Sequence, residues 1–168
     1  TFVARTVDTD IHHLTAVLQR AAAHRGSAFI EVYQNCKIFN DGVFEYATDK
    51  GIKADNTLYL EHGKPLIFGK DRNKGIRLNG HEPEVVTIGE GGITEADILV
   101  HDETDPLIAY MLSRIYWPQF PVPVGVLRNI SKPTHDQMLV DQLEQATAAR
   151  GAGDLKKLLN SGETWIVS

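Results

Sequence analysis

The stretch that decides the fold is residues 10–42, which read DIHHLTAVLQRAAAHRGSAFIEVYQNCKIFNDG. Apolar residues recur at helical spacing in its first part, which predicts a helix over about residues 10–24, capped by Asp8 or Thr9. Gly26 suits the turn that ends such a helix. The apolar and aromatic run at residues 27–33 then predicts a strand. A helix, a glycine and a strand in this order are typical of an α/β fold.

The strand at residues 27–33 leads into a polar loop that contains Cys36. Because the strand is mostly apolar, we expect it to be buried and central in its sheet. Ligands of open α/β sheets bind just outside the carboxyl ends of the strands. The single cysteine of the chain is therefore predicted to lie where such a fold keeps its chemistry.

The middle of the chain changes character. Residues 57–88 hold short apolar runs separated by turn residues, which predicts an antiparallel hairpin segment added to the α/β fold. Further along, residues 124–127 fit an edge strand, and helices are expected at 105–116, from Thr134 to Gly151 and at 155–159. We expect a division into an α/β part, residues 1–56, and a C-terminal extension, residues 57–168.

Composition excludes some classes of function. The net charge of −5 argues against nucleic-acid binding, which rests on Lys and Arg meeting phosphates, and against an anionic membrane surface. No apolar run approaches the length that spans a bilayer. One free cysteine suits a reducing, cytoplasmic setting. The chain begins at Thr1 without a signal-peptide pattern, and we expect it to be a fragment or a processed piece.

Cys36 is the first candidate for chemistry. A cysteine at a strand end can act as a nucleophile, a redox thiol or a metal ligand, and it can also be inert and buried. No histidine lies near it in the sequence to act as a base. A single cysteine cannot hold a zinc ion or an iron–sulfur cluster alone, so a metal role requires ligands from outside this chain.

The other polar motifs give weaker evidence of a functional site. The seven histidines show no metal-binding spacing, and we interpret residues 101–103 as a solvated strand end before a helix cap. Residues 89–92 fit a tight turn better than a phosphate loop. A basic cluster stands out in this acidic chain, and it consists of Lys64, Lys70, Arg72, Lys74 and Arg77. Such clusters are usually solvated, although this one could steer an acidic partner or bind a phosphorylated cofactor.

Beyond these patterns, the chain resembles a known family over essentially its whole length. The strand and loop at residues 27–42, with their Tyr-Gln-Asn-Cys-x-Ile-Phe-Asn-Asp-Gly motif, look like the β subunit of thiamine-diphosphate-dependent 2-oxoacid:ferredoxin oxidoreductases. This form of the motif points to the 2-oxoglutarate branch. The other matching segments are residues 2–5, 59–66, 74–78, 101–103 and 161–165.

The resemblance implies part of a thiamine-diphosphate-binding, doubly wound fold. It implies that Cys36 is one of four cysteine ligands of a [4Fe–4S] cluster, and that Asn35 and Asn40 lie near the cluster and cofactor. The family's signatures for thiamine diphosphate and Mg²⁺ and its other cluster cysteines are absent here. They would belong upstream of Thr1, so we expect this chain alone to bind neither cofactor and to be inactive.

The function implied is that of the C-terminal portion of such a β subunit. The whole enzyme would convert 2-oxoglutarate and coenzyme A to the acyl-CoA and reduce ferredoxin, and its parts would include the N-terminal half of the β subunit and an α subunit. Three alternatives stay open. They are a subunit for pyruvate or another 2-oxoacid, a non-catalytic assembly module, and an enzyme with Cys36 as nucleophile.

Overall fold

A computed structural model describes residues 1–167 of the chain. The chain divides into two compact units, residues 1–132 and the segment that begins at Pro133. We describe each unit by itself. The division expected between residues 56 and 57 stays a prediction.

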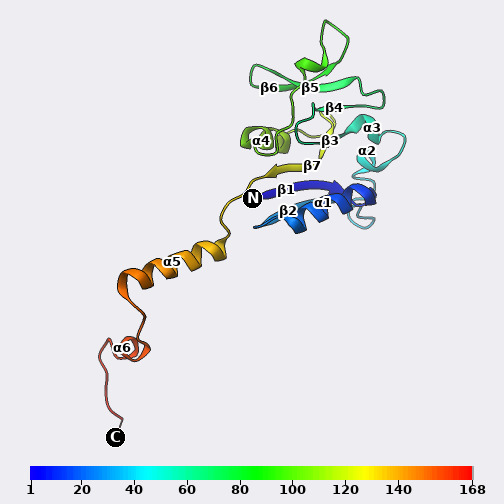
Figure 1. Cartoon of the computed structure of the whole chain (residues 1–168). Helices are drawn as coiled ribbons and strands as arrows, with labels where there is room; N and C mark the ends of the chain where they lie inside the picture. Colours follow the sequence, from blue (N-terminus) through cyan, green and yellow to red (C-terminus); the bar gives the residue numbers. More distant parts are fainter. Residues whose placement is uncertain (168) are drawn as a thin grey trace. The chain divides into compact units, whose positions relative to one another are not determined.

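The first unit is built on a four-stranded mixed sheet (Figure 1). Its strands are β1 (Phe2–Val7), β2 (Ala28–Tyr33), β3 (Thr57–Leu60) and β7 (Val122–Asn129). The order across the sheet is β2-β1-β7-β3; β1 runs parallel to β2, β3 runs parallel to β7, and β7 runs antiparallel to β1. The predicted α/β class is therefore confirmed.

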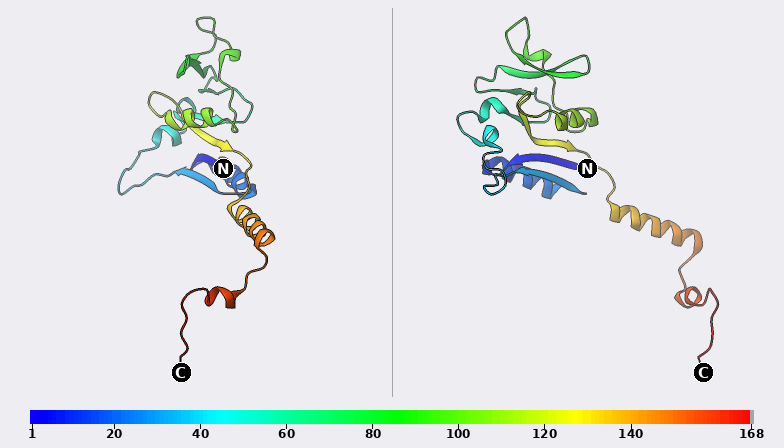
Figure 2. Two further views of the ribbon diagram at one scale, coloured as in Figure 1. Left: turned by 90° about the vertical axis from the view of Figure 1, so that its left-hand side faces the viewer. Right: turned by 180° about the vertical axis from the view of Figure 1, so that it is seen from behind.

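The helix α1 (Ile11–Ala23) connects the parallel strands β1 and β2. Its cap is Asp10, whose side chain accepts a hydrogen bond from the backbone of His13, so the expected cap at Asp8 or Thr9 is wrong. Val17 faces the sheet and packs with Phe2 of β1. Both the side and the rear views show α1 alongside β1 and β2 (Figure 2).

The predicted antiparallel segment is confirmed as a three-stranded sheet in the order β4-β5-β6. It consists of β4 (Ile67–Phe68), β5 (Lys74–Asn79) and β6 (Glu82–Thr87). β3, which the sequence pattern puts in the same segment, instead joins the first sheet beside β7. Leu58, Leu66 and Ile76 form a core with Leu112 of the helix α4 (Pro106–Arg114). The remaining short helices are α2 (Glu45–Thr48), α3 (Lys53–Asn56) and the 3₁₀ turn η1 (Glu95–Asp97).

Two expectations about strand position are wrong. β2 is an edge strand, and its residues are half-buried or exposed, with Phe29 65% exposed. β7, expected at an edge, lies inside the sheet between β1 and β3 and is almost entirely buried. An apolar run shows that a strand suits burial, but which elements of the chain cover it depends on the tertiary fold.

The second unit consists of α5 (His135–Arg150) and α6 (Leu155–Leu159). Thr134 caps α5 by accepting a hydrogen bond from the backbone of Gln137, and Gly151, at φ +81°, ends it, as predicted. No residue of either helix is buried within the part of the chain that the structure describes.

Candidate functional site

The candidate site is the loop that follows β2 and contains Cys36. β1 and β2 are parallel, so their carboxyl ends meet at the same edge of the sheet, and the loop leaves from this edge. The position predicted for Cys36 is therefore the one that the structure gives it. The loop leads into α2 at Glu45.

Hydrogen bonds close this loop on itself. The Asn35 side-chain oxygen accepts from the backbone N–H of Gly42 at 2.9 Å, and Asn35 Nδ2 donates to Asp41 Oδ1 at 2.8 Å. Inside this clamp, the backbone N–H of Asn40 donates to the carbonyl oxygen of Cys36 at 2.9 Å. The turn from Cys36 to Asn40 is thus held in a fixed backbone conformation, although it is exposed.

The loop backbone stabilises the charged form of the cysteine. The backbone N–H groups of Phe39 and Ile38, with a smaller effect from Asn40, hydrogen-bond the Cys36 sulfur and hold its pKa below the ordinary value. Cys36 is also exposed. An accessible sulfur with N–H donors aimed at it suits a thiolate, the form that binds metals and attacks electrophiles. Hydrogen bonds to sulfur also tune iron–sulfur clusters.

The three site residues predicted from the sequence lie together in this loop. Asn35 uses its amide group to hold the loop itself, as described above. Asn40 is exposed, and its side chain makes no hydrogen bond among residues 1–167. Asn40 therefore has a free amide for a ligand, whereas Asn35 has the role of a positioning residue in this structure.

Large apolar side chains are exposed on the loop and on the strand that leads into it. Ile38 and Phe39, on the tip of the loop, are 87% and 89% exposed, and Phe29 and Val32 on the edge strand β2 are also exposed. Large apolar side chains gathered on one exposed loop and a free strand edge are typical of a contact surface.

Sequence reasoning misses Asp8 at this edge of the sheet. Asp8 follows β1 directly, its backbone N–H donates to the Tyr33 carbonyl at 3.0 Å, and its Oδ1 is buried without a hydrogen-bond partner among the described residues. The sequence pattern does not predict the strand β1 and makes Asp8 a helix cap instead. An acidic residue immediately after a β-branched run is the available signal.

The chain by itself offers too few ligands for a metal centre. Within residues 1–167 there is no group of three or more His, Cys, Asp or Glu side chains that could hold a metal ion. Cys36, the one cysteine of the sequence, can supply a single thiolate. The loop therefore fits one ligand of a shared cluster and does not fit a complete site.

His101 and Glu103 are more buried than expected. His101 is 1% exposed and Glu103 is 8% exposed, so this segment is not a solvated strand end. Glu103 is held by Arg20 of α1, and His101 Nε2 hydrogen-bonds the Val126 carbonyl oxygen at 2.8 Å. Both residues tie the core of the first unit together.

Four of the five residues of the basic cluster separate into two groups, and the fifth, Lys70, is exposed. Lys74 pairs with Asp55 at 2.9 Å and Arg77 pairs with Glu84, so these two cations are structural. Lys64 and Arg72 instead line a cavity, and the structure records no ion pair for either side chain within the described residues. The turn at residues 89–92 is confirmed, with the backbone of Gly89 bonded to Ile93.

Comparison with known proteins shows which protein the sequence of this chain is similar to. No protein-family model matches it. It is 37% identical over 172 aligned positions to the 2-oxoglutarate oxidoreductase subunit KorB of Mycobacterium tuberculosis, a match that covers 99% of this chain and 45% of that protein. The chain thus spans less than half the length of this curated relative. The predicted resemblance is confirmed.

The fold has a solved counterpart. The structure of 2-oxoglutarate:ferredoxin oxidoreductase from Magnetococcus marinus, with 2-oxoglutarate, coenzyme A and succinyl-CoA bound, matches 98% of this chain and 41% of that one, with a TM-score of 0.57 and 18% identity. At that identity the likeness concerns the fold. Separately, none of the helices described here is long and apolar enough to cross a membrane.

Proposed function

Because the chain is similar over 99% of its length to a subunit of a 2-oxoglutarate oxidoreductase, we propose that it forms the C-terminal half of the β subunit of a 2-oxoglutarate:ferredoxin oxidoreductase. The assembled enzyme decarboxylates 2-oxoglutarate oxidatively, forms the coenzyme A thioester and passes the electrons to ferredoxin. Thiamine diphosphate, held with Mg²⁺ by residues outside this chain, supplies the carbanion stabilisation for that reaction when it is bound.

The role of this chain in the reaction is to provide one of the four ligands of a [4Fe–4S] cluster. Cys36 provides one thiolate, and three further cysteines come from the other half of the subunit. The backbone donors at Ile38 and Phe39 reduce the negative charge on the sulfur, which raises the tendency of a cluster to accept an electron. Asn40 has a free side-chain amide that can donate to the cluster or the cofactor.

This chain also has an exposed surface to which the other half of the subunit can bind. Ile38 and Phe39 form an exposed apolar surface in the same loop as Cys36, which is where the remaining cluster ligands must approach, and the edge strand β2 leads directly into this loop. We assign this surface to the N-terminal half of the β subunit. An α subunit and ferredoxin are the further partners of the assembly, and the setting is cytoplasmic.

Iron analysis of the assembled enzyme tests the proposal. We expect the anaerobically purified assembly to contain iron and acid-labile sulfide in equal amounts. Cys36→Ser should lose much of both and weaken the electron paramagnetic resonance signal of the reduced cluster, because an alcohol is a poorer ligand than a thiolate. Gln34→Ser is the matched control, since it places serine in the same loop at an exposed polar side chain that is neither a ligand nor part of the apolar contact surface.

The outcomes separate the proposal from its rivals. An iron content that is equal in the Cys36→Ser and Gln34→Ser variants would show that Cys36 is not a ligand of the cluster. An assembly without any iron would overturn the function, and it would favour the assembly-module alternative. Turnover with pyruvate and not with 2-oxoglutarate would assign the enzyme to another branch of the family.

A second candidate is supported by the lowered pKa of Cys36. An exposed thiol with stabilising donors could act as a nucleophile. In that case Cys36 of the assembled protein should be alkylated rapidly at neutral pH with loss of activity. If Cys36 is a cluster ligand, it is protected until the cluster is removed.

A further inference from the structure

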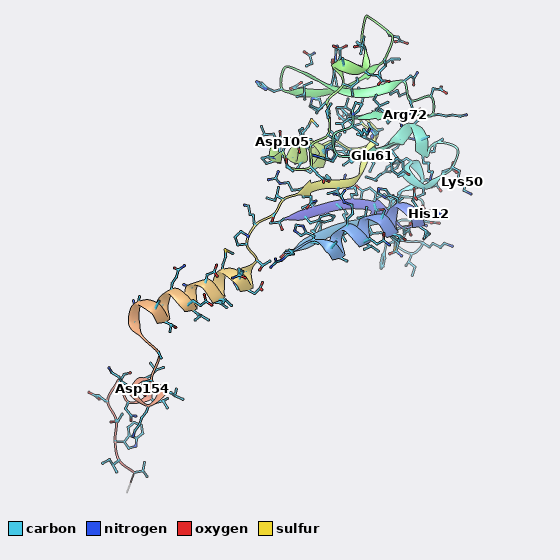
Figure 3. All side chains as sticks on the ribbon, in the orientation of Figure 1. His12, Lys50, Glu61, Arg72, Asp105 and Asp154 are labelled. Atoms are coloured by element: carbon cyan, nitrogen blue, oxygen red, sulfur yellow. The ribbon has the colours of Figure 1, made fainter. Side chains whose placement is uncertain are left out.

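A cavity beside β3 and β4 is lined by charged side chains that have no role in the proposed function. Its volume is about 340 Å³, within the range of sites for small ligands. It is lined by Ala54, Thr57, Tyr59, Glu61, Lys64, Pro65, Ile67, Phe68, Gly69 and Arg72. The labelled side chains of Glu61 and Arg72 lie near each other in this region (Figure 3).

Charge makes this cavity attractive to an anion. Lys64 and Arg72 contribute two positive charges and Glu61 one negative charge, which leaves a net charge of +1 in a chain whose net charge is −5. None of the three side chains takes part in an ion pair or a side-chain hydrogen bond within residues 1–167. Two other members of the basic cluster, Lys74 and Arg77, are neutralised by acidic partners.

The wall of the cavity supplies a second observation. Thr57 is 3% exposed, and its hydroxyl oxygen is buried with no hydrogen-bond partner in the described part of the chain. An unpaired buried hydroxyl carries an energetic cost, so Thr57 leaves an unsatisfied polar atom just behind the surface of the cavity wall. Pro65, Ile67 and Phe68 contribute apolar side chains to the remainder of the wall.

From this arrangement we propose that the cavity is a binding site for a small oxyanion, a carboxylate or a phosphate group of a metabolite, held between Lys64 and Arg72. The guanidinium of Arg72 offers a fork of parallel donors to two oxygens, and the ammonium of Lys64 adds a point charge. Glu61 limits the site to weakly charged anions, because each further negative charge on the ligand is repelled. This site does not depend on the proposed function.

Calorimetric titration of the purified native assembly with inorganic phosphate and, separately, with succinate tests the site. We expect saturable binding of at least one probe; tighter binding of phosphate assigns a phosphate ligand, and tighter binding of succinate a carboxylate. Lys64→Met and Arg72→Met should each weaken binding about tenfold, the value of one charge-assisted contact. Glu61→Gln should tighten binding several-fold, because a repulsive charge is removed.

Lys50→Met is the matched control. Lys50 lies between α2 and α3, is not part of the cavity wall, and its replacement changes the net charge of the chain by the same amount (Figure 3). It should leave the affinity unchanged. The proposal is overturned if neither probe binds saturably, if Lys50→Met weakens binding as much as Lys64→Met, or if Glu61→Gln has no effect.

Discussion

Asn35 holds Gly42 across the loop that contains Cys36. The side-chain oxygen of Asn35 accepts the Gly42 backbone N–H at 2.9 Å, and its Nδ2 group donates to Asp41. Gly42 has φ +78°, a conformation that glycine adopts without strain. One side chain therefore fixes both ends of the turn whose N–H groups stabilise the cysteine.

Removing this clamp should change the acidity of the thiol. Asn35→Ala leaves the donors at Ile38 and Phe39 less fixed, so the pKa of Cys36 should rise toward its ordinary value. The rate of alkylation of the iron-free chain, measured as a function of pH, reports this pKa. Asn40→Ala is the matched control, because the Asn40 side chain has no hydrogen bond in the described structure. Equal shifts in both variants would contradict the clamp.

A close contact of the backbone predicts a large loss of stability at Gly125. Gly125 in β7 has φ +126°, and a Cβ there would lie 2.9 Å from the carbonyl oxygen and from Cβ of Leu60 in β3. Gly125→Ala should therefore lower the free energy of unfolding by roughly 2–4 kcal/mol, from strain and crowding together. Chemical denaturation measures the loss.

Gly80→Ala separates the two causes. Gly80 also has a positive φ, +65°, but no heavy atom of the described chain lies within 4 Å of the point that a Cβ would occupy there. Its replacement should cost about 1–2 kcal/mol, the strain alone. If Gly125→Ala costs no more than Gly80→Ala, the two strands are not in the close contact described.

The ion pair between Arg20 and Glu103 should stabilise the first unit measurably. Arg20 Nη2 lies 2.8 and 3.0 Å from the two carboxylate oxygens of Glu103, and the Glu103 side chain is only 10% exposed. Arg20→Met leaves this carboxylate without its cation. We expect a loss of about 1–2 kcal/mol, less than for a fully buried pair because the Arg20 side chain is 46% exposed.

A double-mutant cycle isolates the contribution of the pair. Arg20→Met, Glu103→Gln and the double variant are compared by chemical denaturation, and the coupling energy should be about 1 kcal/mol. A coupling energy near zero would mean that each side chain acts through other contacts.

The individual helices and strands of this fold can be predicted from the sequence more readily than the elements that pack against each of them. The spacing of apolar residues suffices for α1, although its cap is Asp10 and not Asp8 or Thr9, and the cap residues suffice for α4 and α5, because helix formation depends on contacts within one segment. The place of Cys36 follows from its position just after the predicted strand at residues 27–33, since ligands of open α/β sheets bind at the carboxyl ends of strands. By contrast, the sequence wrongly predicts a central β2, because nothing in residues 28–33 indicates what covers them.

The candidate site shows the same limit. Its loop can be found from its position and its motif, but the clamp formed by Asn35 depends on backbone geometry that the sequence does not reveal. In the basic cluster, residue types alone cannot distinguish Lys74, which is paired with Asp55, from Lys64, which lines a cavity. Partners that are distant in sequence decide which charge remains available.

His101 makes stability depend on pH. Its Nε2 atom must carry the proton, because it lies 2.8 Å from the Val126 carbonyl oxygen, which can only accept; Nδ1 is then buried without a partner in the described residues. Burial lowers the pKa of His101, against the opposing charges of Glu103 and Asp102. The unfolded chain therefore binds a proton at a higher pH than the folded chain, and stability falls as pH drops below about 6.5.

His101→Gln should reduce this fall, because glutamine can donate to the same carbonyl but does not titrate. The free energy of unfolding of the variant, measured between pH 7 and about pH 5, should decline less than that of the parent chain. His13, whose pKa is also lowered mainly by burial, retains part of the decline in both. His12→Gln, which replaces an exposed histidine of α1, is the matched control and should keep the parent's slope. If His101→Gln declines as steeply as His12→Gln, the imidazole is not the buried, neutral group that the packing around Val126 requires.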